Sequence, residues 1–259
     1  MQGRLSSKLE LVALEGVPLV HAGDDLASLI LDALARTELM LEPRDILVIA
    51  QKIVSKSEGR LVGLDSVEPS PRAIEIAPFV DKDPRLVEVI LRESREVLRM
   101  RAGIIVVEDV RGLVLANAGL DASNVNADGG DGNVLLLPVD PDASAARLRT
   151  AIQARTGQDV GVIINDSIGR AWRNGTIGTA IGVSGLPALL DLRGSPDLFG
   201  RQLRTSDLGL ADEIAAAASL LMGQAGEGRP VILVRGVPYE RREGDAGELL
   251  RPKALDFFR

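Results

Sequence analysis

The stretch Val160-Gly161-Val162-Ile163-Ile164-Asn165-Asp166 joins an uninterrupted apolar run to an amide and a carboxylate. A short run rich in Val and Ile is typical of a strand that is buried on both faces. Proteins of the α/β class bind their ligands beyond the carboxyl ends of such strands. We therefore expect a buried strand over residues 160–165, with Asp166 at its exposed end.

Similar apolar runs recur along the chain and alternate with amphipathic helical patterns. Residues 104–108 and 112–116 flank a short turn, which predicts a hairpin and therefore some antiparallel pairing. Ser70-Pro71 and Asp83-Pro84 are typical helix starts. The predicted fold is mixed α/β (α+β). Its strands are expected at residues 9–14, 45–54, 104–108, 112–116, 134–139, 160–165, 180–183 and 230–235, and its helices at 25–35, 71–80, 84–99, 144–155 and 210–222.

The length of 259 residues fits one large domain, and no long linker divides the chain. We predict a single domain over residues 1–259. The charged segment around residues 67–101 is predicted to be helical. It would form either a lid or small second lobe, or a solvated helical hairpin packed on a sheet.

Composition excludes several classes of function. The chain has no cysteine, which rules out disulfides, thiolate metal sites and cysteine nucleophiles, and its single histidine, His21, argues against a Ser-His-Asp triad. A net charge of −7 and 2% aromatic residues argue against nucleic-acid binding. Neither a targeting pattern nor a membrane-spanning run is recognisable. We expect a cytoplasmic protein that binds neither nucleic acid nor membrane.

Polar loops follow two of the predicted strands in the first half of the chain. Lys52 and Lys56 come after the run 46–50, where lysines suit phosphate oxygens, although an edge strand with solvated lysines fits equally well. Asp121 and Asn124 follow the strand 112–116. Asp121 is a hard oxygen ligand for Mg²⁺ or Mn²⁺, whereas the simpler interpretation of this loop is an Asx turn.

Two further loops lie in the second half of the chain. Residues 166–173 combine Asp166 and Ser167 with Arg170 and Arg173, either for anion binding or as a structural ion-pair turn. Residues 222–229 are rich in glycine, which suits a phosphate-binding nest or a plain helix–strand connection. The chain has no P-loop and no dinucleotide-binding glycine motif, so a nucleotide site would have to use these loops.

Taken together, these loops resemble those of the coenzyme F420-0:L-glutamate ligases, the γ-glutamyl ligases of deazaflavin biosynthesis. The resemblance implies a mixed α/β ligase fold that works as an intertwined homodimer. The matching segments occur in the order of the family, at residues 15–20, 54–60, 117–125, 166–173, 197–201, 211–216 and 221–228.

The activity that this resemblance implies is a GTP-dependent ligation. GTP would phosphorylate the terminal carboxylate of the lactyl-phosphate arm of coenzyme F420-0, and the amine of L-glutamate would then displace phosphate from the acyl phosphate. One or more γ-linked glutamates would be added. The family requires Mn²⁺ or Mg²⁺ at two sites, and K⁺ stimulates it.

The resemblance also assigns roles to individual residues. Asp121 and Asp166 would bind the first metal ion, and Ser167 and Gln224 the second, although Gln224 stands where archaeal members have an acidic residue. Asp166, Arg170 and Arg173 are the expected catalytic residues, the two arginines by charge and position alone. The expected GTP contacts are Val17, Pro18, Leu19, Val20, Gln51, Lys52, Lys56, Asn124, Met222, Gly223, Gln224, Ala225, Gly226, Glu227, Gly228 and Arg229.

Three questions remain open at the level of sequence. The base that deprotonates the glutamate amine could be Asp166, Glu58 or solvent. The chain could instead be a GTP-binding regulatory module without ligase activity. A third possibility is a related amide ligase that uses a different acceptor acid.

Overall fold

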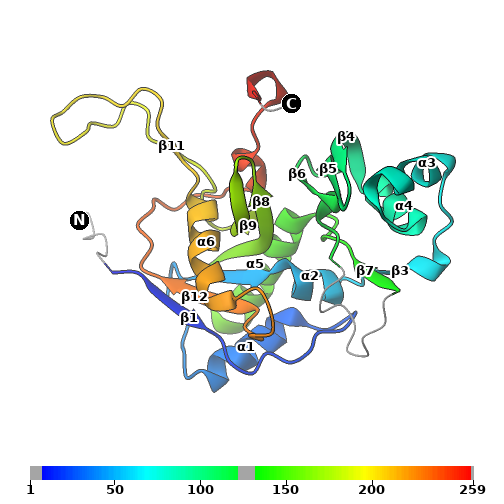
Figure 1. Cartoon of the computed structure of the whole chain (residues 1–259). Coiled ribbons are helices and arrows are strands. Elements are labelled where there is room, and N and C mark those ends of the chain that lie inside the picture. The colour runs from blue at the N-terminus through cyan, green and yellow to red at the C-terminus, as the bar shows by residue number, and fades with distance from the viewer. Residues whose placement is uncertain (1–7, 122–131, 258–259) are drawn as a thin grey trace.

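A five-stranded sheet forms the centre of the protein (Figure 1). The computed structural model describes residues 8–121 and 132–257. Strands β2 and β8 run parallel, and the other neighbouring strands of this sheet run antiparallel. The order across the sheet is β1 (Glu10–Ala13), β12 (Val231–Arg235), β2 (Ile46–Ala50), β8 (Gly161–Arg170) and β9 (Arg173–Ser184).

Helices cover both faces of this sheet and confirm the mixed α/β class. Helices α1 (Leu26–Arg36) and α5 (Pro141–Thr156) pack on one face, and α6 (Leu210–Met222) packs on the other. Side chains alternate along each strand, so Leu47 packs toward α1 while its neighbour Ile46 packs toward α6. The strands are therefore apolar on both faces, as their sequences predict.

The parallel pair β2 and β8 brings the carboxyl end of β2 beside the middle of β8. Ala50 at the end of β2 pairs with Asn165 of β8. The expected strand 45–54 is wrong in its second half, because helix α2 (Gln51–Ser57) begins where β2 ends. Its branched residues Ile53 and Val54 are buried from a helix instead of from a strand, and an apolar run this short does not distinguish the two structures.

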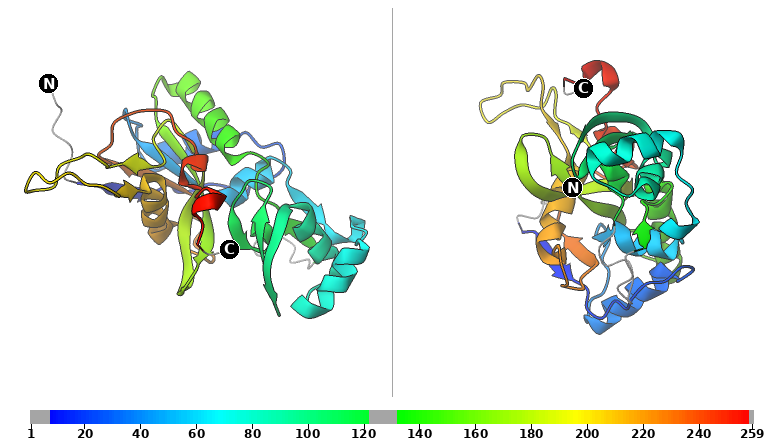
Figure 2. Two further views of the ribbon diagram at one scale, coloured as in Figure 1. Left: turned by 90° about the horizontal axis from the view of Figure 1, so that it is seen from above. Right: turned by 45° about the vertical axis from the view of Figure 1, so that its right-hand side comes forward.

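Strand β8 is longer than expected and forms a projecting hairpin with β9. It passes through Asp166 and continues to Arg170, and the hairpin extends away from the rest of the sheet (Figure 2). Asp166 therefore lies within a strand and not in the loop after it. The polar sequence 165–170 gave no sign of this extension, which depends on pairing with β9.

Residues 71–116 have a hydrophobic core of their own. Ser70 and Asp83 cap the helices α3 (Pro71–Val80) and α4 (Pro84–Arg92) as predicted. The predicted helix 84–99 is wrong beyond Arg92, because the following residues pair with β5 as a strand despite their helix-forming composition. The predicted hairpin is confirmed, in a sheet of β4 (Ser94–Arg101), β5 (Ile104–Asp109) and β6 (Val114–Ala116).

Two short antiparallel pairs complete the fold. The pairs are β3 (Leu61–Gly63) with β7 (Asn133–Leu135) and β10 (Leu190–Asp191) with β11 (Asp207–Leu208). Strand β7 is shorter than the predicted strand 134–139 because it pairs only along the length of β3. No helix of the described residues is long and apolar enough to cross a membrane. Single 3₁₀ turns lie at η1 (Leu64–Ser66), η2 (Asn117–Gly119), η3 (Ala246–Leu249) and η4 (Lys253–Leu255).

Candidate active site

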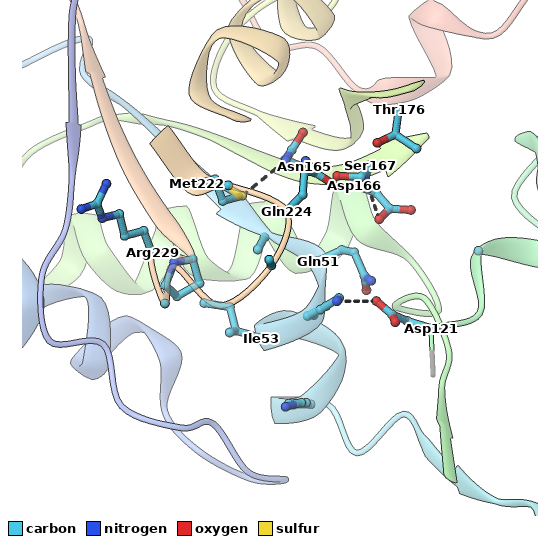
Figure 3. A pocket seen from close by; sticks show the side chains of 18 of the residues that line it. Gln51, Ile53, Asp121, Asn165, Asp166, Ser167, Thr176, Met222, Gln224 and Arg229 are labelled. Carbon is cyan, nitrogen blue, oxygen red and sulfur yellow. Dashed lines mark hydrogen bonds and ion pairs between the residues drawn. The ribbon is translucent and has the colours of Figure 1, made fainter. Parts of the chain in front are cut away.

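A cavity of about 730 Å³ opens where β2 ends and its parallel pairing with β8 stops (Figure 3). Its walls come from the loop before α1, the end of β2 with helix α2, β6 with the segment after it, the β8–β9 hairpin and the loop after α6. Most of the residues selected from the sequence line it. They are Val17, Pro18, Leu19, Val20, Gln51, Lys52, Lys56, Asp121, Asp166, Ser167, Met222, Gly223, Gln224, Ala225, Gly226, Gly228 and Arg229.

An ion pair crosses the cavity between α2 and the segment after β6. The Lys52 Nζ lies 2.7 Å from the Asp121 Oδ2, and both side chains are partly buried. Two backbone hydrogen bonds hold Asp121 in place. The Asp121 N–H donates to the Leu135 carbonyl oxygen at 3.0 Å, and the Leu135 N–H donates to the Asp121 carbonyl oxygen at 2.8 Å. The carboxylate is thus presented from a fixed backbone.

Asp166 faces the same cavity from β8, and its carboxyl group is hard to ionise. Burial raises the pKa of Asp166 to about 6, and the negative charge of Asp121 adds to the effect. The Ser167 N–H, which donates to the Asp166 Oδ1 at 2.8 Å, and the Lys52 ammonium act in the opposite direction. The carboxylates of Asp121 and Asp166 are close enough for an electrostatic interaction although the two residues are 45 positions apart in the sequence.

Helix α2 places two lysines on the same wall. Lys52 and Lys56 are four residues apart, which puts both side chains on one face of a helix. Burial lowers the pKa of Lys56, and repulsion from the Lys52 ammonium lowers it further. An anion that enters the cavity would relieve this repulsion, so α2 favours a ligand with several negative charges.

The loop after α6, at residues 223–229, forms another wall of the cavity. Gly223 ends the helix with a φ of +74°, and Gly228 has a φ of +66°. Glu227 bends back within the loop, where its Oε2 accepts a hydrogen bond of 2.8 Å from the Ala225 N–H, and it does not line the cavity. The loop is thus shaped partly by Glu227, which sequence reasoning had assigned to GTP.

The oxygen donors around the cavity suit a hard divalent cation. Asp121 and Asp166 supply carboxylates, Ser167 a hydroxyl and Gln224 an amide. Among the described residues there is no cluster of three or more His, Cys, Asp or Glu side chains that could enclose a metal ion. Mg²⁺ commonly takes one or two carboxylates and completes its shell with water and phosphate oxygens, so this donor set fits a cation that arrives with a phosphorylated ligand.

Four of the residues considered earlier lie apart from this cavity or cannot be placed. Arg170 and Arg173 are exposed at the tip of the β8–β9 hairpin, where the Arg170 guanidinium donates to the Asn174 carbonyl. Glu58 accepts hydrogen bonds from Ser144 and Arg147 and does not line the cavity. Asn124 lies outside the described residues.

Asn165 is a cavity residue that sequence reasoning missed. Its Nδ2 donates to the Ser219 Oγ at 3.2 Å and approaches the Met222 sulfur at 3.5 Å. Within the described part of the chain, its Oδ1 is the one buried side-chain oxygen that has no partner. Its place directly before Asp166 was the only available signal.

The remaining lining residues were not assigned to the site from the sequence, although four of them lie within the segments 117–125 and 166–173 that resemble the family. They are Ala50, Ile53, Leu115, Ala116, Gly119, Leu120, Ile168, Gly169, Thr176 and Pro230.

Comparison with known proteins agrees with this arrangement. The model of the family described as F420-0:Gamma-glutamyl ligase matches residues 16–236. Proteins named coenzyme F420:L-glutamate ligase are similar over nearly their whole length. The protein of Methanothermobacter thermautotrophicus is 48% identical over 97% of this chain and 99% of its own. That of Methanopyrus kandleri is 46% identical, with coverage of 97% and 99%, and that of Archaeoglobus fulgidus is 43% identical, with 97% of each chain covered. The chain therefore belongs to the F420-0:gamma-glutamyl ligase family, whose members are ligases that form carbon–nitrogen bonds.

Proposed function

We propose that the protein joins L-glutamate to coenzyme F420-0 in a reaction driven by GTP, with Mn²⁺ or Mg²⁺ at two sites. The γ-phosphoryl group of GTP passes to the terminal carboxylate of F420-0, which leaves GDP and an acyl phosphate. The glutamate amine then attacks the acyl carbon and expels phosphate, which forms the amide. Further glutamates are added through γ-linkages.

The observation that carries this proposal is a single cavity lined by two carboxylates, two lysines and a glycine-rich loop. A carboxylate is a poor electrophile, and conversion to a mixed anhydride with phosphate makes it reactive. Phosphoryl transfer depends mainly on positioning and on neutralising charge, and these residues supply both. The names of the curated relatives support the choice of F420 and glutamate.

The chain's own residues divide the task between the two ends of the cavity. Lys52 and Lys56 bind the phosphate chain of GTP, and the loop 222–229 with Val17 to Val20 holds the nucleotide. Asp121, Asp166, Ser167 and Gln224 would hold the divalent cations, whose positive charge would offset the negative charge of the phosphate chain during transfer. The Gln224 amide is a neutral ligand, so the second site relies more on phosphate oxygens.

The acceptor enters from the hairpin end. Thr176 and Arg229 lie at opposite ends of the cavity in Figure 3, and the lining residue Gly169 pairs with Thr176 across the hairpin, next to Ile168. The hairpin end has room for the lactyl-phosphate arm beside Asp166. Arg170 and Arg173 lie further out on the same hairpin, where their positive charge attracts the phosphodiester of the acceptor.

We further propose that two copies of the chain form the working unit. The arm between β10 and β11 carries Leu198 and Phe199, whose side chains are 99% and 95% exposed. Large apolar side chains exposed at this level favour burial against another protein surface. A reaction that consumes GTP also places the enzyme in the cytoplasm, where GTP is made.

The test incubates the purified chain with F420-0, L-glutamate, GTP and Mn²⁺, with and without K⁺, and measures product masses and released phosphate. We expect F420-0 carrying one or more glutamates, with GDP formed in proportion. GTP binding without phosphate release would identify a regulatory module. Ligation to a different hydroxy acid, but not to F420-0, would identify a related ligase. Either result would reject the proposal.

A further inference from the structure

Four charged side chains form a buried cluster outside the cavity. The Glu93 carboxylate bridges two guanidinium groups, with its Oε1 at 2.9 Å from the Arg60 Nη2 and its Oε2 at 2.9 Å from the Arg111 Nη2. The Arg111 Nη1 also lies 2.8 Å from the Asp109 Oδ2. All four side chains are largely buried. Burying ion pairs brings little net stability, so this cluster calls for another explanation.

The remaining donors of both arginines reach one short stretch of backbone. The Arg60 Nε donates to the Leu137 carbonyl oxygen at 2.9 Å. The Arg111 Nε donates to the Pro138 carbonyl oxygen at 2.7 Å, and its Nη2 reaches that of Leu137 at 3.2 Å. The cluster therefore fixes the backbone at residues 137–138.

The residues directly before this stretch of backbone hold Asp121. Leu135 exchanges two backbone hydrogen bonds with Asp121, and the Leu136 N–H donates to the Arg60 carbonyl oxygen at 3.1 Å. Arg60 is the third residue after the end of α2, and α2 carries Lys52. The cluster is thus connected to both members of the Lys52–Asp121 ion pair, to Lys52 through the short link from Arg60 back to α2 and to Asp121 through residues 135–138.

We propose that Glu93 is a positioning residue for the ligase reaction. By bridging Arg60 and Arg111, it fixes the place of Asp121 opposite Lys52 and Asp166 and so sets the geometry in which a divalent cation binds. Without the Glu93 charge, two guanidinium groups would share the buried site with Asp109 alone. Their repulsion would move residues 135–138, and Asp121 with them. This inference rests on the proposed role of Asp121 as a metal ligand.

A matched pair of variants tests this role. Glu93→Gln removes the bridging charge, whereas Glu88→Gln removes a buried charge from the same lobe, one whose carboxylate is bound by Arg92 and by the Ser70 N–H. Both variants should lower the melting temperature. We expect Glu93→Gln alone to weaken Mn²⁺ binding, measured by titration calorimetry, by about tenfold or more, a typical effect of disturbing the support of a metal ligand. It should also raise the Mn²⁺ concentration for half-maximal activity, with a smaller change in the KM for glutamate.

Equal Mn²⁺ affinity in the two variants would overturn the inference. If Glu93→Gln fails to fold, Arg111→Lys decides instead, because it keeps the charge but cannot reach Glu93 and the backbone carbonyls together, and its Mn²⁺ affinity should fall in the same way. The wild-type protein separates this inference from the proposed function. Failure of wild type to ligate glutamate rejects the function, whereas normal ligation with unchanged Mn²⁺ affinity in Glu93→Gln rejects only the role of Glu93.

Discussion

Asp166 illustrates how the needs of the site conflict with stability. Its pKa of about 6 in the folded protein lies well above the ordinary value of 3.8. The folded state therefore binds a proton more readily than the unfolded state, and stability falls as the pH rises between these two values. At neutral pH the metal-free protein holds a carboxylate charge that the surrounding structure disfavours.

Replacing Asp166 by asparagine should stabilise the fold and abolish ligation. The amide keeps the shape of the side chain but carries no charge. We expect the melting temperature of the metal-free protein at neutral pH to rise by about 2–4 °C, which is what about 1 kcal/mol gives for a chain of this size. Scanning calorimetry measures this change, and product masses measure activity. A lower melting temperature or a fully active variant would contradict the prediction.

The same pKa predicts how cation binding depends on pH. A carboxyl group must lose its proton before it can bind a metal ion, so protons compete with the cation below the pKa of Asp166. We expect Mn²⁺ affinity to be nearly constant above about pH 7 and to fall by up to about tenfold per unit below about pH 6. Titration calorimetry across this range measures the affinity. Asp166→Asn is the control, and an equally steep dependence in that variant would show that another group is responsible.

At the level of elements, a β-bulge in β9 explains a pattern that the sequence could not reveal. Ile164 pairs with Gly182 while Asn165 pairs with Ala180, which leaves Ile181 as an extra residue. Gly178 and Gly182 are four residues apart and would share one face of a regular strand. Because of the bulge, Gly178 faces α6 and Gly182 faces α5.

Two aspartates from the covering helices satisfy the backbone around this bulge. The Asp212 Oδ1 of α6 accepts from the Ala180 N–H at 2.9 Å, and the Asp142 Oδ1 of α5 accepts from the Val183 N–H at 2.7 Å. The segment 211–216 resembled the family, but its sequence did not say why an aspartate is there. The structure assigns Asp212 a place in supporting β9.

The close contact between β9 and α6 predicts a cost for any side chain at Gly178. A Cβ atom there would clash with the Ser219 Oγ and with the Ala215 carbonyl oxygen, so helix backbone would have to move. We expect Gly178→Ala to lower the free energy of unfolding by about 1–3 kcal/mol, as overpacking does, measured by urea denaturation. Gly169→Ala on the same hairpin is the control, because nothing lies within 4 Å of its Cβ. Equal stability of the two variants would contradict this reading of the contact.

The sequence predicted those features of the fold that depend on local chemistry. The caps at Ser70 and Asp83 and the hairpin after residue 104 follow from short-range rules, and the structure confirms them. Prediction from the sequence failed where pairing with a distant strand determines the structure, as in β4 and in the outer half of β8. The same distinction applies to the residues of the site. Motif residues such as Asp121 and Asp166 were found, whereas Thr176, which reaches the cavity only through the returning strand of the hairpin, was not.

At the scale of the whole molecule, the arm between β10 and β11 contributes no residue to any of the four hydrophobic cores of the described residues. It leaves the body of the protein as an extended loop (Figure 1). Its tip, at residues 197–201, is one of the segments that resemble the family, yet it lines no part of the cavity. A segment that serves neither the core nor the cavity is well placed to contact a second copy.

If two copies associate through this arm, its exposed apolar side chains should dominate the binding energy, because large apolar anchors commonly carry most of an interface. We expect the double variant Leu198→Ser, Phe199→Ser to weaken self-association by about 30-fold or more, equivalent to about 2 kcal/mol. Light scattering over a concentration series measures this change. Phe79→Ser is the control, since that apolar side chain is also exposed (71%) but lies on α3, outside the arm. A wild-type chain that stays monomeric, or a double variant that dimerises as wild type does, would show that the arm does not join two copies. Ligation measured on the same samples would then show whether one chain suffices to complete the cavity.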